Sequence, residues 1–493
     1  MSAMNWNAVQ PEIVLLVMAC VVAMVDLWVT DVRRMPTFLL AIGSLAVVAF
    51  LHLRAFDAGT TVYAMQRMVV ADPLGHLLGF FAAVAMIVSL VYARPYAQSR
   101  EMLKGELFTL AMFALLGIFV MVSANNFLVV YLGLELMSLS LYALTAMRRD
   151  HPPATEAAMK YFVLGALASG FLLYGLSMMY GAAGSLEIGE VFKAIGTGQI
   201  NKAVLALGIV FVVSGLAFKL GVVPFHMWVP DVYQGAPTAV TLMIGGAPKL
   251  AAFAITIRLL VEGMLGLAVD WQQMLVVLSV GSMALGNLAA IAQSNLKRML
   301  AYSTIAQMGF MLLGLCSGVV GGNTLSAANA YSSSMFYVVA YVLTTLGTFG
   351  LVMLLSRDGF ESEQIDDLKG LARRSPWFAA VMAIFMFSLA GVPPTVGFYA
   401  KLSVLQALVS TNVAGLIWLA VAAVLLSLIG AFYYLRLVKV MYFEEPIDPQ
   451  PIGSTGEVRA LLSLNGAAVL LFGLLPGGLM AMCAQAIVKA LAT

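Results

Sequence analysis

The sequence predicts an all-α polytopic membrane protein with about fourteen transmembrane helices, and three observations support this prediction. Hydrophobic residues make up 62% of the 493 residues and charged residues 10%, whereas about a quarter of the residues in soluble domains are charged. Apolar stretches of roughly 20 residues, each long enough to cross ~30 Å of hydrocarbon, recur from Glu12 to the C-terminus. None alternates with period two as barrel strands do, so helices are expected, because helices satisfy their own backbone in lipid.

The order of these stretches predicts how the chain is organised. The predicted spans cover residues 12–31, 36–56, 72–93, 105–123, 126–147, 154–181, 201–229, 238–262, 272–293, 297–318, 326–356, 376–408, 413–443 and 460–490. We expect three N-terminal helices within 1–103, a five-helix repeat in 104–262, a second, inverted five-helix repeat in 270–443, and a loop with the last helix in 444–493. Each inverted repeat is expected to contain one broken helix.

Basic residues in the connections predict the orientation. They fall in every second connection, at Arg33, Arg34, Arg94, Arg100, Lys104, Arg148, Arg149, Lys297, Arg298, Lys369, Arg373 and Arg374. By the positive-inside rule these connections are cytoplasmic, although Arg67, Lys193 and Lys202 lie on the opposite side. An even number of spans then places both termini in the periplasm of a bacterial inner membrane. No basic segment precedes the first apolar stretch, so we expect that helix to be retained.

Charge and cysteine usage argue against other classes. The net charge of +2 is too small to indicate a nucleic-acid or acidic partner. Cys20, Cys316 and Cys483 are widely spaced within apolar runs and form no CxxC pair. We interpret them as small packing residues and predict no disulfide, metal site or iron–sulfur centre.

An internal repeat supports the inverted arrangement. Residues 218–224 (FKLGVVP) match 387–393 (FSLAGVP) at an offset of 169, which aligns Ser388 with Lys219. Residues 157–161 match 327–331 at an offset of 170. Because five spans fit each copy, the copies should insert in opposite orientations, and inverted repeats with interrupted helices are typical of transporters.

Four ionisable residues fall inside predicted spans, namely Glu135, Lys219, Lys249 and Lys401. A charge at mid-bilayer costs ~2.5 kcal/mol or more, so such groups usually face protein or water and serve a function. Lys219 precedes a Gly-Val-Val-Pro break, Lys249 follows Gly-Gly-Ala-Pro, and Lys401 follows Gly-Val-Pro-Pro by about two turns. Glu135 lies near the centre of its span and needs a lysine from another helix nearby. The pattern predicts a proton relay.

Other polar residues could join this relay or simply lie at the interface. Lys160 lies about two turns from a Pro-Pro loop, so it either joins the relay or snorkels to the surface. His226, beside the break and Trp228, either passes protons or is structural. We interpret Arg258 as snorkelling. The same interfacial interpretation applies to His52, His76 and His151.

Three motifs resemble a known family. Residues 218–238 (FKLGVVPFHMWVPDVYQGAPT), 295–309 (NLKRMLAYSTIAQMG) and 391–398 (GVPPTVGF) resemble the antiporter-like subunits of respiratory complex I, the proton-pumping NADH:quinone oxidoreductase. The similarity extends over nearly the whole chain. Lys401 in the second broken helix, together with the chain length, favours the subunit N branch of that family.

This resemblance implies a role for each buried charge. Glu135 pairs electrostatically with Lys219, Lys249 lies centrally on the hydrated axis, and Lys401 ends the relay. Flavin, iron–sulfur clusters and quinone are expected on partner subunits, with no cofactor or metal on this chain. The expected partners are other membrane-arm subunits, including related antiporter-like ones, and lipid.

The resemblance therefore implies a translocase subunit that relays protons from cytoplasm to periplasm, driven by redox chemistry elsewhere. Two alternatives stay open. One is a stand-alone or multisubunit cation/proton antiporter, because such proteins share the signature. The other is a structural scaffold, in which buried lysines would destabilise the fold without purpose.

Overall fold

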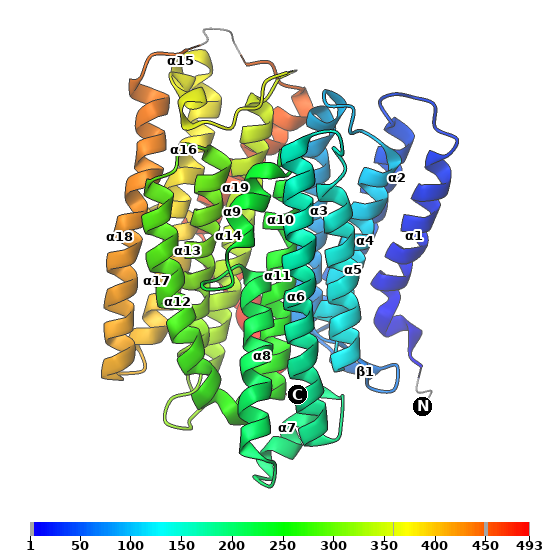
Figure 1. The fold of residues 1–493 in the computed structure, drawn as a ribbon, viewed down its shortest axis with the longest axis vertical. Helices are drawn as coiled ribbons and strands as arrows, with labels where there is room; N and C mark the ends of the chain where they lie inside the picture. The colour runs from blue at the N-terminus through cyan, green and yellow to red at the C-terminus, as the bar shows by residue number, and fades with distance from the viewer. Residues whose placement is uncertain (1–3, 358, 448–451, 493) are drawn as a thin grey trace.

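The computed structural model describes residues 4–357, 359–447 and 452–492, and these form a bundle of roughly parallel and antiparallel helices (Figure 1). The α-helices are α1 Gln10–Asp26, α2 Met35–Ala58, α3 Pro73–Gln98, α4 Gly105–Val122, α5 Phe127–Thr145, α6 Pro152–Ala183, α7 Ile188–Gly196, α8 Lys202–Leu220, α9 Trp228–Gly235, α10 Thr238–Gly245, α11 Ala247–Thr256, α12 Ala268–Ile291, α13 Leu296–Leu315, α14 Ala327–Leu355, α15 Leu371–Arg374, α16 Pro376–Ala390, α17 Val396–Val409, α18 Ala414–Phe443, α19 Gly456–Leu474 and α20 Gly477–Leu491. The shorter elements are β1 Val62–Ala64, β2 Val69–Ala71, a π-helix Ile257–Gly263, and 3-10 helices Trp6–Val9, Leu265–Leu267 and Ile365–Leu368.

The predicted fold class is confirmed. Among the described residues, 12 helical segments are long and apolar enough to cross a bilayer. The range predicted as 297–318 is occupied by the 20-residue α13, and the range 376–408 by the shorter apolar helices α16 and α17. The last predicted span forms α19 and α20, which are separated at Leu475 and Pro476. Every predicted span therefore corresponds to one helix or to consecutive helices.

Polar caps explain where several spans begin. Asp72 accepts a hydrogen bond from Gly75 N at the start of α3. Asn126 and Asn295 do the same at the starts of α5 and α13. Each side chain satisfies one of the backbone N–H groups that a helix leaves without a partner at its N-terminus.

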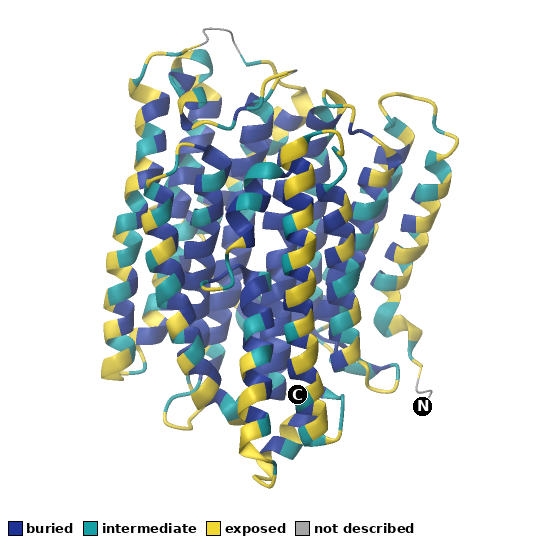
Figure 2. Cartoon of the chain, in the orientation of Figure 1, coloured by how far each residue is buried: buried dark blue, intermediate teal, exposed yellow. Residues whose placement is uncertain are grey.

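The centre of the bundle is the span made by α10, α11 and the π-helix. Its most apolar stretch is 100% buried, whereas that of α18 is 22% buried. Figure 2 shows the same contrast, with a buried interior and exposed positions along the outer faces of α1 and α18. Helices α3 and α14 pack directly on α10 and α11. Side chains of the central span therefore face protein rather than lipid.

Two spans are interrupted at a glycine in the left-handed conformation. Helix α8 ends at Gly221, with φ 79°, and α16 ends at Gly391, with φ 85°. Gly221 N donates to Ala217 O and Gly391 N donates to Phe387 O, each at 2.9 Å. The two ends therefore correspond at an offset of 170 residues. The alignment at 169 was wrong by one position, and Leu389, not Ser388, is the counterpart of Lys219.

The two interrupted helices run in opposite directions. In Figure 1, α8 begins beside α7 at the lower end of the bundle, whereas α16 begins beside α15 at the upper end. This is the direction that an inverted pair requires. The repeat boundaries at 104–262 and 270–443 stay a prediction.

Small elements on the side opposite the basic connections were not predicted. Strands β1 and β2 form an antiparallel hairpin, and the amphipathic α7 lies between α6 and α8. Arg67 of the hairpin donates to Glu187, just before α7, at 2.6 Å. These elements close the lower end of the bundle around α3, α5 and the π-helix.

Candidate functional site around the buried lysines

Lys249 is held against the end of a neighbouring helix. Its side chain is 1% exposed, and Nζ donates to Leu220 O at 2.8 Å and to Lys219 O at 3.3 Å. These are the last two residues of α8, whose carbonyls have no partner within the helix. A helix C-terminus carries partial negative charge, so it favours a cation there. A Cβ at Gly221 would lie 2.8 Å from Val229 Cγ2 and 3.5 Å from Lys249 Nζ, so glycine leaves room for this approach.

Lys401 repeats this arrangement at the second break. Its Nζ donates to Leu389 O at 3.1 Å, to Ala390 O at 3.0 Å and to Ser427 Oγ at 2.7 Å. Leu389 and Ala390 are the last two residues of α16. Whereas Lys249 comes from a different span, Lys401 comes from α17, the second half of the same interrupted span. Both lysines thus bind the carbonyl end of a broken helix.

Lys219 contacts the helix of Glu135 through a serine. Lys219 Nζ donates to Ser138 Oγ at 2.9 Å, and Ser138 lies one turn after Glu135 on α5. The hydroxyl of Ser138 donates in turn to Leu134 O at 2.6 Å. No ion pair joins Glu135 to Lys219 within the described residues, and Glu135 Oε1 is buried without a hydrogen bond. The carboxylate nevertheless interacts Coulombically with the lysine.

Lys160 lies at the rim rather than in the core. Its side chain is 42% exposed and pairs with Glu156 and Asp231, each at 2.8 Å. Arg298 pairs with the other oxygen of Asp231 at 2.7 Å. Partial burial of Asp231 raises its pKa, but hydrogen bonds from Lys160 and Arg298 outweigh burial, so the pKa lies below its ordinary value. These groups line a polar cavity of about 390 Å³, together with Gln234.

His226 lies in the connection between α8 and α9, half-buried, and its Nδ1 has no hydrogen-bond partner. The structure does not bring it into hydrogen-bond contact with Lys219 or Lys249, within the residues described. Its ring therefore lies beside the break without joining the contacts that hold the lysines.

A cluster of neutral polar side chains adjoins Lys401 and was missed by the sequence reasoning. Gln307 Nε2 donates to Leu389 O at 2.9 Å, the same carbonyl that accepts from Lys401. It also donates to Tyr434 Oη at 3.0 Å, and Tyr337 Oη donates to Gln307 Oε1. Gln307 lies within the motif 295–309, but it was not predicted as a site residue because only charged residues were considered.

The contacts between the two lysine sites are aromatic and hydroxylic. Tyr233 packs edge-on against Trp228, whose ring lies 5.6 Å from Lys249 Nζ. On the side towards Lys401, Tyr341 donates to Thr304 Oγ1 at 2.8 Å. Thr304 lies one turn before Gln307 on α13. Across the described residues, no single hydrogen bond joins Lys249 directly to Lys401.

Two interfacial interpretations were wrong. Arg258 does not snorkel: it is 1% exposed and pairs with Asp72 at 2.6 Å and Glu262 at 2.8 Å. His52 is 2% exposed, and its Nδ1 lies 3.2 Å from His76 Nδ1. The sequence indicated how far each of these residues lies from the end of its span. It did not indicate which neighbouring helices cover the side chain.

The cysteines divide into two environments, because Cys316 and Cys483 are buried while Cys20 is exposed. The packing interpretation therefore fails for Cys20. In the parts of the chain that the structure describes, no group of three or more His, Cys, Asp or Glu side chains is placed to hold a metal ion.

Comparison with known proteins gives a consistent match. The family model for the NADH:quinone oxidoreductase/Mrp antiporter membrane subunits matches residues 124–430. NADH-quinone oxidoreductase subunit N of Herminiimonas arsenicoxydans is 62% identical over 497 residues, covering 100% of both chains. The subunit N of Polaromonas naphthalenivorans is 61% identical over 487 residues, covering 98% of this chain and 97% of the relative.

Solved structures share the fold. A chain of respiratory complex I from Thermus thermophilus is 29% identical with a TM-score of 0.79, covering 97% of this chain and 100% of that one. A chain of the Mrp complex from Dietzia sp. has a TM-score of 0.85 at 19% identity, covering 99% and 98%, which shows the fold alone. This chain therefore belongs to the subunit N family of the antiporter-like membrane subunits of NADH:quinone oxidoreductase.

Proposed function

We propose that this chain translocates protons across the bacterial inner membrane as a membrane-arm subunit of NADH:quinone oxidoreductase, driven by redox chemistry in other subunits. The observation that supports it best is the repeated placement of a buried lysine on the carbonyl end of a broken helix, at Lys249 and at Lys401. A static fold has no need for two such costly cations at mid-bilayer.

The environment of these lysines suits proton exchange. Burial disfavours an ammonium group, whereas a helix C-terminus favours it. When opposing effects of this kind nearly cancel, an amine can hold or release a proton at small cost. Backbone carbonyls accept hydrogen bonds from either form, so the site keeps its geometry while its charge changes.

The proposed order of transfer follows the contacts. A change at Glu135 alters the field on Lys219 across Ser138. Lys219 then releases its proton towards Lys249, whose Nζ binds the backbone carbonyl of Lys219 itself. Transfer continues to Lys401 through the polar side chains around Thr304 and Gln307, and release follows to the periplasm.

Uptake would start at the side of the basic connections. The polar cavity that contains Lys160 and Asp231 opens on that side, which the positive-inside rule makes cytoplasmic. Lys160 would thus supply the path rather than form part of its core, and His226 would help to hydrate the break. Both termini would then lie in the periplasm.

The redox groups would belong to partners. Flavin, iron–sulfur clusters and quinone would lie on other subunits of the complex, and this chain would contact membrane-arm subunits, including related antiporter-like ones. The relatives from Herminiimonas and Polaromonas bear the name of that oxidoreductase, which supports this assignment.

Proton translocation by the purified complex in proteoliposomes tests the relay. Lys219→Ala and Glu135→Ala should each lower NADH-driven pumping and quinone reduction together, because the two processes are coupled. Lys202→Ala is the matched control, since Lys202 lies exposed at the start of the same helix α8. Pumping at the wild-type rate in both Lys219→Ala and Glu135→Ala would contradict the proposal.

An independent cation/proton antiporter is the second candidate, favoured by the fold shared with the Mrp complex. Purification of the tagged chain distinguishes the two, because only the first candidate copurifies with a quinone-reducing complex. Full activity after Lys401→Met would instead favour a scaffold.

A further inference from the structure

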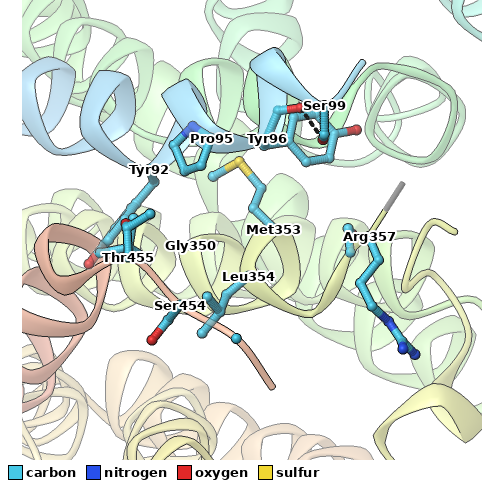
Figure 3. Close-up of a pocket in the computed structure, with 13 residues that line it drawn as sticks. Tyr92, Pro95, Tyr96, Ser99, Gly350, Met353, Leu354, Arg357, Ser454 and Thr455 are labelled. Atoms are coloured by element: carbon cyan, nitrogen blue, oxygen red, sulfur yellow. Dashed lines mark hydrogen bonds between the residues drawn. The ribbon is translucent and has the colours of Figure 1, made fainter. Parts of the chain in front are cut away.

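A polar cavity of about 460 Å³ lies away from the lysines, at the ends of α3 and α14 beside the segment that enters α19. Figure 3 shows Tyr92 and Thr455 at one end of this cavity and Arg357 at the other, with Met353 and Leu354 between them. It lies on the side of the basic connections, next to Arg94. None of these groups belongs to the proposed relay.

The cavity offers donors to an anion. Helix α19 begins at Gly456 after Thr455 without a side-chain cap, so its first N–H groups remain available. Tyr92, which is 1% exposed, lines the cavity, and its hydroxyl has no hydrogen-bond partner. Asn465 lies near this hydroxyl, and when its oxygen and nitrogen are exchanged, it donates to Leu343 O and accepts from Gly347 N, each at 3.0 Å.

Two arginines and one glutamate lie at or beside the cavity. Glu457 lies in the first turn of α19 and opposes an anion, but Arg94 pairs with it at 3.7 Å. Arg357 contributes a second guanidinium at the far end of the cavity, 5.4 Å from the ring of Phe360. Basic pockets between transmembrane helices on the cytoplasmic side bind anionic lipid headgroups.

A second cavity, apolar and of about 300 Å³, lies along the same three helices. It is lined by Val88 of α3, Leu346 of α14 and Leu461 of α19, each one turn deeper than a residue of the polar cavity. On α19 the lining residues of the apolar cavity run from Leu461 to Phe472, about 17 Å of helix at 1.5 Å per residue. One leaflet of a ~30 Å hydrocarbon core has about that depth.

We propose that this cleft binds a phospholipid with an anionic headgroup, whose phosphate lies at the N-terminus of α19 beside Tyr92 and whose acyl chain fills the apolar cavity. The polar cavity offers hydrogen-bond donors to a phosphate headgroup. The apolar cavity has about the depth of an acyl chain in one leaflet. The bound lipid joins α19 to α3 and α14, and it takes no part in proton transfer.

Two pairs of variants test this assignment. Ala468→Phe places a ring in the apolar cavity, which Ala468 lines, and the neighbouring exposed Ala467→Phe is its control. Thr455→Asp keeps a good N-cap residue but adds a negative charge at the phosphate position, and Thr455→Asn is its neutral counterpart. Both pairs leave the buried lysines untouched.

The tagged chain, purified with its partners, is stripped by detergent and incubated with mixed micelles of phosphatidylglycerol or phosphatidylcholine, or with inorganic phosphate alone. Bound lipid is then measured by mass spectrometry. We expect wild type and Ala467→Phe to retain phosphatidylglycerol over phosphatidylcholine, and Ala468→Phe to lose that lipid. Thr455→Asp should weaken retention about tenfold, which corresponds to 1.4 kcal/mol, whereas Thr455→Asn should not.

Several results would overturn the proposal. Equal retention of the two lipids by wild type would show that the site does not select an anionic headgroup. Binding of inorganic phosphate without any retained lipid would indicate that the ligand is a free anion. Equal lipid content in Ala468→Phe and Ala467→Phe would show that no acyl chain occupies the apolar cavity. Loss of a partner subunit in Ala468→Phe alone would assign the cavity to a protein helix.

Discussion

The amine of a membrane lysine needs acceptors in every charge state, and the two break-associated lysines obtain them differently. Lys401 has three acceptors, including Ser427, so an ammonium with three N–H groups is fully bonded. Lys249 has two backbone acceptors, which match a neutral amine. Loss of a proton therefore removes a contact at Lys401 and none at Lys249.

Ser138 links Lys219 to the helix of Glu135, so its removal should slow the proposed relay. We expect Ser138→Ala to reduce NADH-driven pumping about two- to tenfold, since one hydrogen bond contributes about 0.5–1.5 kcal/mol. Ser140→Ala is the control, because Ser140 donates only to Leu136 O on the same helix. Pumping rates in proteoliposomes measure the effect, and equal rates for the two variants would contradict it.

Gln307 shares the carbonyl of Leu389 with Lys401, which makes it a positioning residue for that lysine. Gln307→Leu should lower pumping, with quinone reduction falling in parallel. Gln272→Leu on α12 removes another buried glutamine, which donates to Leu315 O outside this cluster. Both variants should lose about 1–3 kcal/mol of stability, so a pumping defect shared by both would indicate damage to the fold alone.

The sequence could identify the charged members of the site but not the neutral ones. Lys219, Lys249 and Lys401 stand out because a charge in lipid is costly. Ser138 does not, because serines in membrane helices commonly donate to the carbonyl four residues earlier, as both Ser138 and Ser140 do. Only the approach of α8 distinguishes the two.

Among the elements, the interrupted spans depend on a glycine at each break. A Cβ on Gly391 would lie 2.8 Å from Lys401 Cδ, in a backbone conformation that costs other residues about 1–2 kcal/mol. Gly391→Ala should therefore lower the thermal midpoint of the purified protein and displace the lysine. Gly170→Ala on α6, where nothing lies within 4 Å, should leave it unchanged or raise it. A lower midpoint for both would show that the strain is not specific to the break.

Glycine and proline predicted where the spans break, but not the residue register across the repeat. The offset of 169 matched side-chain identities, whereas the backbone hydrogen bonds of Gly221 and Gly391 give 170. The helix α7 and the β1–β2 hairpin were missed because they are short and lie outside the apolar runs.

Across the whole molecule, Glu361 joins segments that are far apart in the sequence. It pairs with Arg100 at 2.6 Å and Arg148 at 3.3 Å, which tie the connection after α14 to those after α3 and α5. Burial raises the pKa of Glu361, but the hydrogen bond from Arg100 outweighs it, so the pKa lies below its ordinary value. A carboxylate of this kind stabilises the fold above its unfolded pKa, and the contribution is lost as pH falls through the folded value.

Glu361→Gln should lower stability at pH 7 by about 1–3 kcal/mol, because Arg100 loses its charged partner. The difference from wild type should shrink as the pH falls below about 4.3, the ordinary pKa of a glutamate, and should disappear once the native carboxylate is protonated at still lower pH. Thermal midpoints at both pH values measure this, with the exposed Glu101→Gln as control. A difference independent of pH would show that charge is not the cause.

Composition and span length predicted the bundle, and the motifs around Lys219, Gln307 and Pro393 identified the family. What could not be predicted was which span lies at the centre, because every span is apolar enough to face lipid. The centre became visible only through the packing of α10 and α11 against α3 and α14.

This central position has a consequence for biogenesis. The chain is synthesised from its N-terminus, so the span that carries Lys249 and Arg258 enters the bilayer before α14 exists to cover it. Until α14 arrives, earlier helices such as α3, α4, α7 and α8 shield these cations from acyl chains. The pairing of Arg258 with Asp72, on a helix inserted earlier, neutralises one of them at once. The order of synthesis thus provides protein neighbours for Lys249 and Arg258 before α14 completes the packing around them.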